Sequence, residues 1–234
     1  MSSKSALYII PTFLSEEGMP SLVDANMTII NDLSIFIVEN LRTARRHLRA
    51  MGYTKNFDTE VTFLEWDKHA KNPISQWFKQ IEKKPVGLLS ECGTPCVADP
   101  GFQVVKVAHM LSIPVFPLVG PNAILLALMG SGFSGQNFTF HGYLPITPVE
   151  RKKMIKQLED ISRKTGYTQL FMETPFRNDA TLKDIFASLN DATFLSVACD
   201  LTLPTQTIIT QTIAQWKKST ISFNKRYCIY SIGN

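Results

Sequence analysis

Residues 90–101 form a loop whose side chains and backbone are suited to holding a small polar ligand. Glu91 and Asp99 supply carboxylates, and Thr94 supplies a hydroxyl group. Gly93 lets a ligand approach the backbone closely, and the prolines of the loop stiffen the chain. Loops of this composition also occur as simple turns, so the residues alone leave both interpretations open.

A second stretch of the same kind follows at residues 119–123. Gly120, Asn122 and Ala123 stand where an apolar helix begins. Free backbone N–H groups at a helix start, together with small side chains, let a polar ligand contact the backbone. This stretch could also be a turn, but two such loops in succession favour a ligand site.

Basic residues are concentrated in two clusters within a chain of net charge +4. This mild excess is compatible with a polyanionic partner but does not require one. Each cluster could contact phosphate or could be the solvated face of a helix. The clusters are Arg42, Arg45, Arg46, His47 and Arg49, and Arg151, Lys152, Lys153 and Lys156.

Strand-like and helix-like segments alternate in the first half of the chain, which is typical of parallel βαβ units. Ligands of such sheets bind beyond the carboxyl ends of the strands, where both candidate loops fall. Strands are predicted at residues 6–10, 33–38, 62–64, 86–89 and 113–118, and helices at 42–51, 74–81, 102–111 and 123–129.

The second half predicts a mixed sheet, and the whole chain therefore predicts an α/β protein. Proline and glycine concentrate near residues 117–122, so we predict two α/β domains, 1–118 and 119–234. Strands are predicted at residues 138–141, 168–172, 193–200, 207–211 and 226–232, and helices at 149–161 and 182–189.

The four cysteines form neither a CxxC pair nor a Cys/His set at zinc spacing, so no metal site is expected. The apolar run at the N-terminus is too short for a signal peptide, and no segment approaches the ~18 apolar residues of a membrane span. We expect a cytoplasmic protein with free thiols.

Five segments in the same order resemble the ribosomal-RNA cytidine 2′-O-methyltransferases of the tetrapyrrole-methylase superfamily. Glu91–Gly101 resembles the family's Asp-Ala-Gly-Thr-Pro-x-x-x-Asp-Pro-Gly loop, and Val38–Leu48 its Glu-Asp-Thr-Arg-x-x-x-x-Leu-Leu segment. The others are Val119–Ile124, similar to Pro-Gly-Pro-Ser-Ala; Phe140–Pro145, similar to Phe-x-Gly-Phe-Leu-Pro; and Glu173–Arg177, similar to Glu-Ser-Pro-His-Arg. The resemblance spans about residues 6 to 211.

The resemblance implies two α/β domains of the tetrapyrrole-methylase type, with S-adenosylmethionine bound in a cleft between them, in a homodimer. It implies a methyltransferase that acts on ribosomal RNA and takes part in rRNA processing. Pro11 would face the substrate side of the site. Carried over by position, the cofactor site comprises Pro11, Glu91, Cys92, Gly93, Thr94, Pro95, Asp99, Gly120, Asn122, Ala123, Met172, Ala198 and Thr202.

A ribose hydroxyl is a poor nucleophile, so a nearby base or cation should assist its attack on the methyl group. Glu39, Arg42 and Arg45 are the candidates for this catalytic role. Without the resemblance, Glu39 would be a carboxylate favoured at a helix start, and the arginines would be a solvated face.

The departures from the family pattern lie on the substrate side. The first loop of the family reads Ala-Thr-Pro-Ile-Gly-Asn-Leu, whereas residues 10–18 here are longer, acidic and lack the early glycine. Glu16 and Glu17 would repel a phosphate backbone. The His-Glu-His-Asn and Arg-Glu-Leu-Thr-Lys segments of the family appear as Leu64–His69 and Cys199–Leu203, so that a basic residue is missing from each end.

These departures leave other functions open. The acceptor could be a small molecule such as a tetrapyrrole-like compound, in a pocket lined by aromatic residues that could equally belong to the core. The chain could also be a non-catalytic relative that binds S-adenosyl ligands. The aromatic residues in question are Phe13, Trp66, Phe133 and Phe176.

Overall fold

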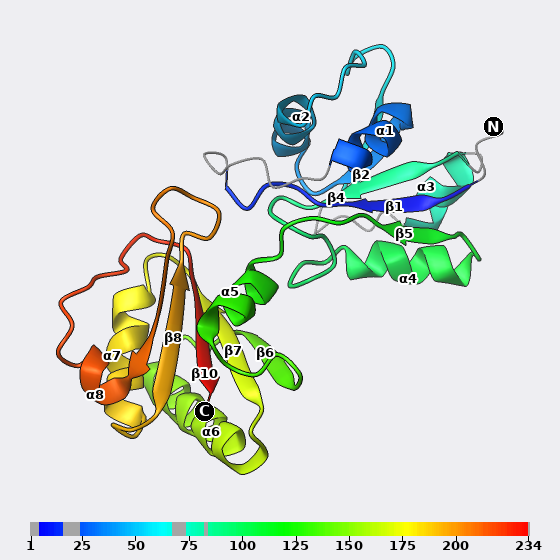
Figure 1. Cartoon of the computed structure of the whole chain (residues 1–234). Coiled ribbons are helices and arrows are strands. Elements are labelled where there is room, and N and C mark those ends of the chain that lie inside the picture. The colour runs from blue at the N-terminus through cyan, green and yellow to red at the C-terminus, as the bar shows by residue number, and fades with distance from the viewer. Residues whose placement is uncertain (1–4, 16–23, 67–73, 82–83, 234) are drawn as a thin grey trace. The chain divides into compact units, whose positions relative to one another are not determined.

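The structure, a computed structural model, describes residues 5–15, 24–66, 74–81 and 84–233. The chain divides into two compact units, residues 1–122 and 123–234 (Figure 1). The domain boundary predicted between residues 118 and 119 falls in the segment that joins the two units, and it stays a prediction.

The first unit is built on a five-stranded sheet in the order β3-β2-β4-β1-β5. Every neighbouring pair is parallel, as the alternation of strands and helices predicted. Its elements are β1 (Leu7–Ile10), α1 (Asp24–Asp32), β2 (Ile35–Val38), α2 (Leu41–Ala50), β3 (Thr62–Glu65), α3 (Ile74–Gln80), β4 (Val86–Leu89), α4 (Phe102–Met110) and β5 (Val115–Pro117).

Helices cover both faces of this sheet (Figure 1). On one face α3 and α4 pack against side chains that include Leu7 and Leu88. On the other face α1 and α2 pack against side chains that include Ile10 and Val38. Strands buried on both sides read as continuous apolar runs, which is why their positions could be predicted.

The second unit contains a mixed five-stranded sheet in the order β6-β7-β10-β8-β9. β6 and β7 are parallel, and the other neighbours are antiparallel. The α/β fold with a mixed second sheet is thus confirmed. The elements are α5 (Ala123–Ser131), β6 (Phe138–Tyr143), α6 (Pro148–Thr165), β7 (Thr168–Glu173), α7 (Asn178–Ser188), β8 (Phe194–Cys199), β9 (Thr207–Thr212), α8 (Ile213–Trp216) and β10 (Cys228–Gly233).

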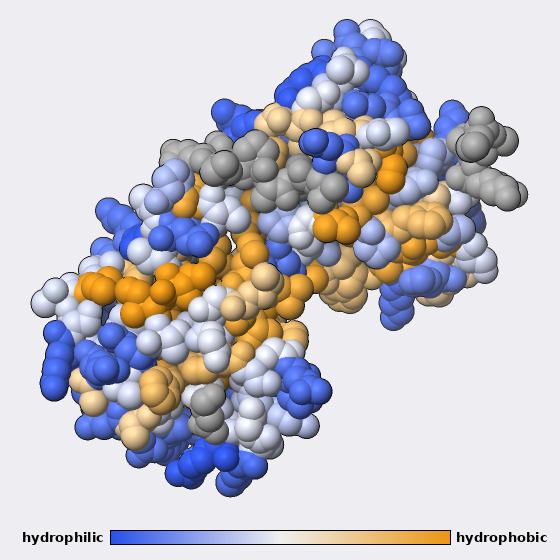
Figure 2. All heavy atoms as spheres, viewed as in Figure 1, coloured by the Kyte–Doolittle hydropathy of each residue, from blue (hydrophilic) through white to orange (hydrophobic). Residues whose placement is uncertain are grey.

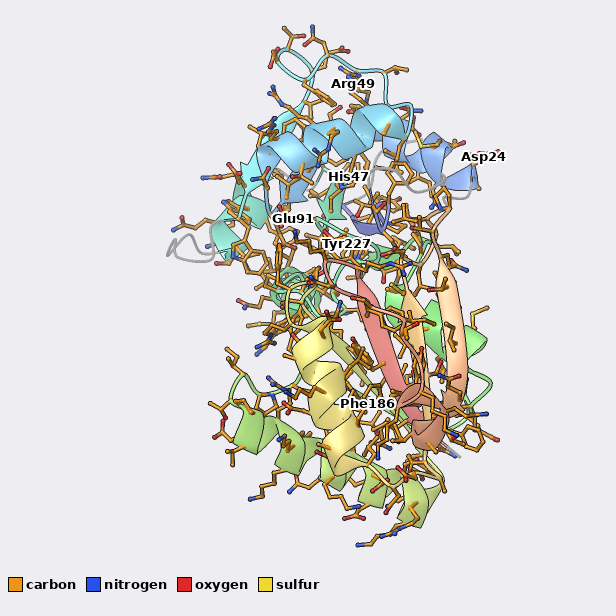
Figure 3. All side chains as sticks on the ribbon, turned by 90° about the vertical axis from the view of Figure 1, so that its left-hand side faces the viewer. Asp24, His47, Arg49, Glu91, Phe186 and Tyr227 are labelled. Carbon is orange, nitrogen blue, oxygen red and sulfur yellow. The ribbon has the colours of Figure 1, made fainter. Side chains whose placement is uncertain are left out.

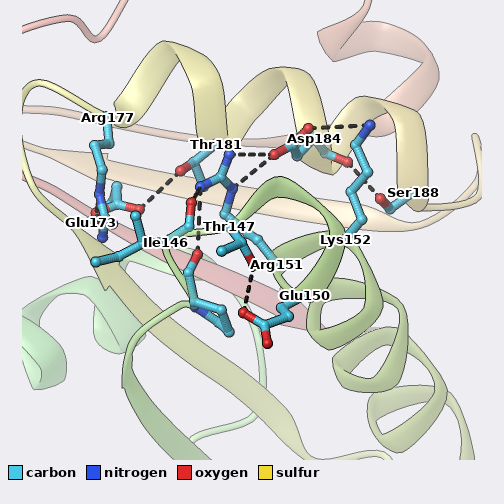
Figure 4. A network of polar contacts seen from close by, with 11 residues as sticks. Ile146, Thr147, Glu150, Arg151, Lys152, Glu173, Arg177, Thr181, Asp184 and Ser188 are labelled. Carbon is cyan, nitrogen blue, oxygen red and sulfur yellow. Dashed lines mark hydrogen bonds and ion pairs between the residues drawn. The ribbon is translucent and has the colours of Figure 1, made fainter.

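The main core of the second unit lies between the sheet and helices α6, α7 and α8. α5 covers the opposite face, where Ile208 of β9 contacts Gly130. Arg151, predicted as part of a basic cluster, is buried inside this unit instead, with only 4% of its surface exposed. Its Nε donates to Asp184 at 2.8 Å and its Nη1 donates to the Ile146 carbonyl at 2.9 Å (Figure 4). Arg151 is therefore not available to bind phosphate.

Several elements differ from those predicted, and α6 extends to Thr165 rather than to residue 161. α7 begins at Asn178 rather than at residue 182, and its first turn is polar but contains the buried Asn178. α1 and α8 were not predicted. α8 carries a capping box in which Thr212 and Gln215 each bond the other's backbone N–H, and that pair was visible in the sequence.

Candidate functional site

The strand order of the first sheet makes the carboxyl end of β4 a topological switch point. The chain leaves β1 and β2 towards helices on one face of the sheet, but leaves β4 towards α4 on the opposite face. β4 lies between β1 and β2, so the connections diverge on both sides of it. Ligands of open α/β sheets bind at such points. The loop at residues 90–101 starts there.

Backbone hydrogen bonds join this loop to the segment that follows β1. The Thr12 N–H donates to the Gly93 carbonyl at 2.8 Å, and the Gly93 N–H donates to the Phe13 carbonyl at 3.2 Å. Cys92, whose thiol is exposed, donates to the Leu14 carbonyl at 3.1 Å. The two loops therefore act as one framework.

Gly93 has a backbone conformation and surroundings that disfavour any side chain. Its φ angle is +69°, in the left-handed region. A Cβ atom would lie 2.8 Å from Leu14 Cδ2 and 3.1 Å from the Pro121 carbonyl oxygen. A larger residue would therefore disturb the loop itself, whether or not a ligand is bound.

The two glycine-containing stretches predicted as a ligand site are in direct contact. Asn122 Nδ2 donates to Thr94 Oγ1 at 2.7 Å. Pro121, beside Asn122, is buried, and Pro95 is buried next to Thr94. Gly120 is half-buried in the same stretch.

Asp99 holds the far end of the loop in place. Its carboxylate accepts the Cys96 N–H at 2.9 Å and the Gly101 N–H at 2.7 Å. Cys96 and Ala98 have positive φ angles of 71° and 63°, and Asp99 stabilises this unusual path. Burial and the Asp99 charge raise the pKa of Cys96 to about 12, so its thiol stays protonated at neutral pH.

Glu91 differs from Asp99 because its side chain is exposed at the start of the loop. Its backbone carbonyl, in contrast, is 3.1 Å from Nε2 of His47, a buried residue of α2 (Figure 3). His47 is not among the site residues predicted from the sequence. A signal was present: His47 is three residues after Ala44, so helical spacing places it on the apolar side of α2.

The three candidate catalytic residues differ in their surroundings. Glu39 is half-buried directly after β2, and Arg42 is exposed in the first turn of α2. Arg45 forms an ion pair with Asp58 at 3.0 Å, and its guanidinium lies 5.5 Å from the Phe63 ring centroid. The structure thus places Glu39 and Arg42 at the carboxyl edge of the sheet. Arg45 instead binds Asp58 in the segment between α2 and β3.

Pro11 is buried directly after β1. Four other candidate residues, Ala123, Met172, Ala198 and Thr202, belong to the second unit. Met172 and Ala198 both pair with Ile229 of β10, so they lie in one row on the same face of the sheet.

The remaining candidates of this unit lie at element ends. Ala123 begins α5. Thr202 has a φ angle of 72°, and its N–H donates to Gln206 Oε1 at 2.8 Å.

The Glu173–Arg177 motif forms a turn held together by its own side chains. The Glu173 carboxylate is fully buried and accepts from Arg177 Nε at 2.7 Å and from Thr181 Oγ1 at 3.0 Å (Figure 4). These bonds fix the start of α7. The motif therefore has a structural explanation within the second unit.

The aromatic residues considered for an acceptor pocket are divided between the two units and differ in burial. Phe13 is buried in the first unit, while Phe133 contacts Gly233 in the second. Phe176 is 78% exposed. Trp66 packs against the core on the α3–α4 side of the first sheet.

Among the residues that the structure describes, no group of three or more His, Cys, Asp or Glu side chains could hold a metal ion. None of the described helices is long and apolar enough to cross a membrane.

The chain is similar in sequence to proteins named as ribosomal RNA methyltransferases. It is 28% identical over 216 residues to ribosomal RNA small subunit methyltransferase I of Xylella fastidiosa, covering 92% of this chain and 75% of that protein. No family model matches the chain.

Solved structures share the fold. The methyltransferase CobJ superposes with a TM-score of 0.61 at 14% identity, over 100% of this chain and 95% of that one. A cobalt precorrin-4 methyltransferase gives 0.60 at 10% identity, over 98% and 95%.

Proposed function

We propose that this chain is a member of the tetrapyrrole methylase superfamily and that it transfers a methyl group from S-adenosylmethionine to a ribose 2′-oxygen of ribosomal RNA. The relatives and the shared fold support the resemblance predicted from the sequence. The observation that carries the proposal is the loop at residues 90–101, which resembles the family's motif and follows the strand at which the connections of the first sheet diverge.

The residues of this loop fit an S-adenosyl ligand. Gly93 lets the loop pack closely against Leu14 and Pro121, and Glu91 presents a carboxylate at the loop surface. Thr94 and Asn122 bring a hydroxyl and an amide together beside them. Such a set suits the hydroxyl, amino and carboxylate groups of a nucleoside joined to an amino acid. We propose that Pro11, Cys92, Pro95, Gly120 and Ala123 complete the surroundings, and that Asp99 acts by shaping the loop.

The second unit would contribute Met172, Ala198 and Thr202 to the same ligand. Met172 and Ala198 share one face of the sheet, which supports their acting together.

S-adenosylmethionine, when bound, supplies a methyl group attached to a positively charged sulfur. We propose that Glu39 accepts the proton of the ribose hydroxyl and that the positive charge of Arg42 stabilises the developing oxyanion. Both residues lie at the carboxyl edge of β2, beside β4. Arg45, bound to Asp58, would support the α2 surface through that ion pair.

The surface of α2 offers cations for the RNA backbone. Arg42 and Arg46 are exposed and are four residues apart, so they lie on the same side of the helix. Phosphate contacts of this kind position RNA without reading its sequence.

We also propose that the protein is a cytoplasmic homodimer. Large apolar side chains are exposed on the second unit, among them Met129, Ile146 and Val149. Figure 2 shows orange, hydrophobic spheres on the surface of this unit. Exposed apolar groups of this size are typical of protein interfaces. Light scattering after size-exclusion chromatography would give twice the chain mass for a dimer, whereas the mass of one chain would contradict it.

Isothermal titration of the purified protein with S-adenosylmethionine tests the cofactor. Transfer of a labelled methyl group to small-subunit ribosomal RNA that lacks the modification then tests the acceptor. Binding with transfer supports the proposal. Binding without transfer to RNA would favour a small-molecule acceptor, and no binding would contradict the methyltransferase.

A further inference from the structure

Two residues of this chain depart from the family pattern at positions that meet in space. When the family's first-loop proline is aligned with Pro11, Phe13 stands where the family has glycine. When the family's glutamate is aligned with Glu39, His47 replaces the first of its two leucines. The Phe13 and His47 rings are in contact, with centroids 5.8 Å apart and planes inclined by 45°.

Both side chains are enclosed: 8% of Phe13 and 4% of His47 is exposed. A buried imidazole is costly unless its polar atoms have partners. His47 Nε2 finds one in the Glu91 carbonyl, 3.1 Å away (Figure 3). A carbonyl oxygen only accepts hydrogen bonds, so Nε2 carries the hydrogen and donates it. A leucine at this position could not form the bond.

Phe13 reaches the same loop by a different route. Its backbone carbonyl accepts the Gly93 N–H at 3.2 Å, while its ring lies against His47. The pair therefore contacts the loop at Glu91 and again at Gly93. It joins three elements that follow strands β1, β2 and β4.

We propose that His47, supported by Phe13, is a positioning residue that holds the loop at residues 90–101 in the conformation that binds the S-adenosyl ligand. This inference rests on the proposed function and adds to it the contacts of Phe13 and His47. Where the family pattern has glycine and leucine, an aromatic ring and a hydrogen-bond donor fix the loop from the side of α2.

The expected loss of affinity depends on how often the loop adopts the conformation that binds the ligand, here called competent. If a hydrogen bond worth about 1 kcal/mol is lost, the loop samples other conformations and the apparent Kd rises by the inverse of the competent fraction. That corresponds to a ~5-fold weaker affinity. The rate constant at saturating cofactor changes little, because His47 contacts the loop and not the acceptor.

The test compares His47→Leu with His47→Gln in the full chain. Glutamine places an amide Nε2 at nearly the same distance from the backbone as the imidazole Nε2 and can donate to the Glu91 carbonyl. The probe is S-adenosylhomocysteine, titrated calorimetrically, with thermal unfolding measured in parallel to show that each variant is folded.

We expect His47→Leu to raise the Kd for S-adenosylhomocysteine ~5-fold, and His47→Gln to restore the affinity to within about twofold of the unmodified protein. Equal affinity of the leucine variant and the unmodified protein would overturn the inference. So would a glutamine variant as weak as the leucine variant. Failure of the unmodified protein itself to bind would instead contradict the proposed function.

Discussion

The loop after β4 and the turn after β7 both begin with a glutamate and contain a Thr-Pro pair, but they use the glutamate in opposite ways. Glu91 is exposed, and the loop around it is held by backbone groups, by Asp99 and by His47. Glu173 is buried and bound to Arg177 and Thr181. Similar motifs thus serve different purposes: the carboxylate of Glu91 stays available to a ligand, whereas the carboxylate of Glu173 stabilises the fold.

The largest expected effect is the loss of the buried Glu173 carboxylate. Glu173→Gln leaves Arg177 without its charged partner, and breaking such a pair costs about 3 kcal/mol of unfolding free energy. Urea denaturation measures it. Glu91→Gln is the matched control, which we expect to stay within about 0.5 kcal/mol because this side chain is exposed. Equal losses in the two variants would remove the distinction between the motifs.

Asp200, another carboxylate of the second unit, should make the stability of the folded protein depend on pH. Burial opposes the charge of Asp200, but hydrogen bonds from Arg226 and Thr205 outweigh it and hold the pKa of Asp200 below its usual range. The stabilisation is complete above the unfolded pKa of about 3.9 and is lost as the pH falls through the lower folded value.

Asp200→Asn should therefore be less stable than the unmodified protein at neutral pH, with the difference shrinking in acid. Unfolding midpoints in urea, measured at neutral pH and in strong acid, check this. A difference that stayed constant with pH would show that the charge of Asp200 is not what stabilises the unit.

A smaller effect is expected where the stretch at residues 119–123 contacts the loop at residues 90–101. Asn122→Ala removes the hydrogen bond to Thr94, which links the two ligand-binding stretches. We expect a ~5-fold weaker affinity for S-adenosylhomocysteine, corresponding to about 1 kcal/mol. Asn224→Ala, at an exposed site in the second unit, is the control. Unchanged affinity in the Asn122 variant would separate this stretch from the ligand site.

The smallest effect concerns the exposed face of α2. Arg46→Ala should reduce the slope of log K for RNA against log salt by about 1, because one phosphate contact is lost. Lys106→Ala removes an exposed cation from α4, on the opposite face of the sheet, and should leave the slope unchanged. Filter binding over a range of salt measures both. Equal slopes for the two variants would show that α2 does not contact RNA.

The first sheet could be predicted in most detail because its central strands are buried on both faces. Helix α1 was missed, since its sequence, Asp24–Asp32, has a short and weak apolar pattern. The start of α7 was placed too late because its first turn is polar and is stabilised by contacts with distant segments. Asn178, for example, donates to the Phe223 carbonyl at 2.8 Å.

The two candidate loops could be recognised in the sequence, because glycine, proline and their spacing are visible there. Their binding of a ligand stays a prediction, and the partners of their side chains could not be predicted. Arg45 was assigned to catalysis, but its ion pair depends on Asp58, whose position follows from the fold of the segment after α2. The bond of His47 depends on α2 packing against the β4 loop, which no local pattern specifies.

The proposed function requires the loop after β4 to bind the methyl donor for transfer to RNA. Labelled methyl transfer to small-subunit ribosomal RNA lacking the modification, followed by mass analysis of its nucleosides, tests this function most directly. We expect a single 2′-O-methylated nucleoside, formed only when S-adenosylmethionine is present. Label on a base, or no label on RNA from a protein that binds the cofactor, would contradict it.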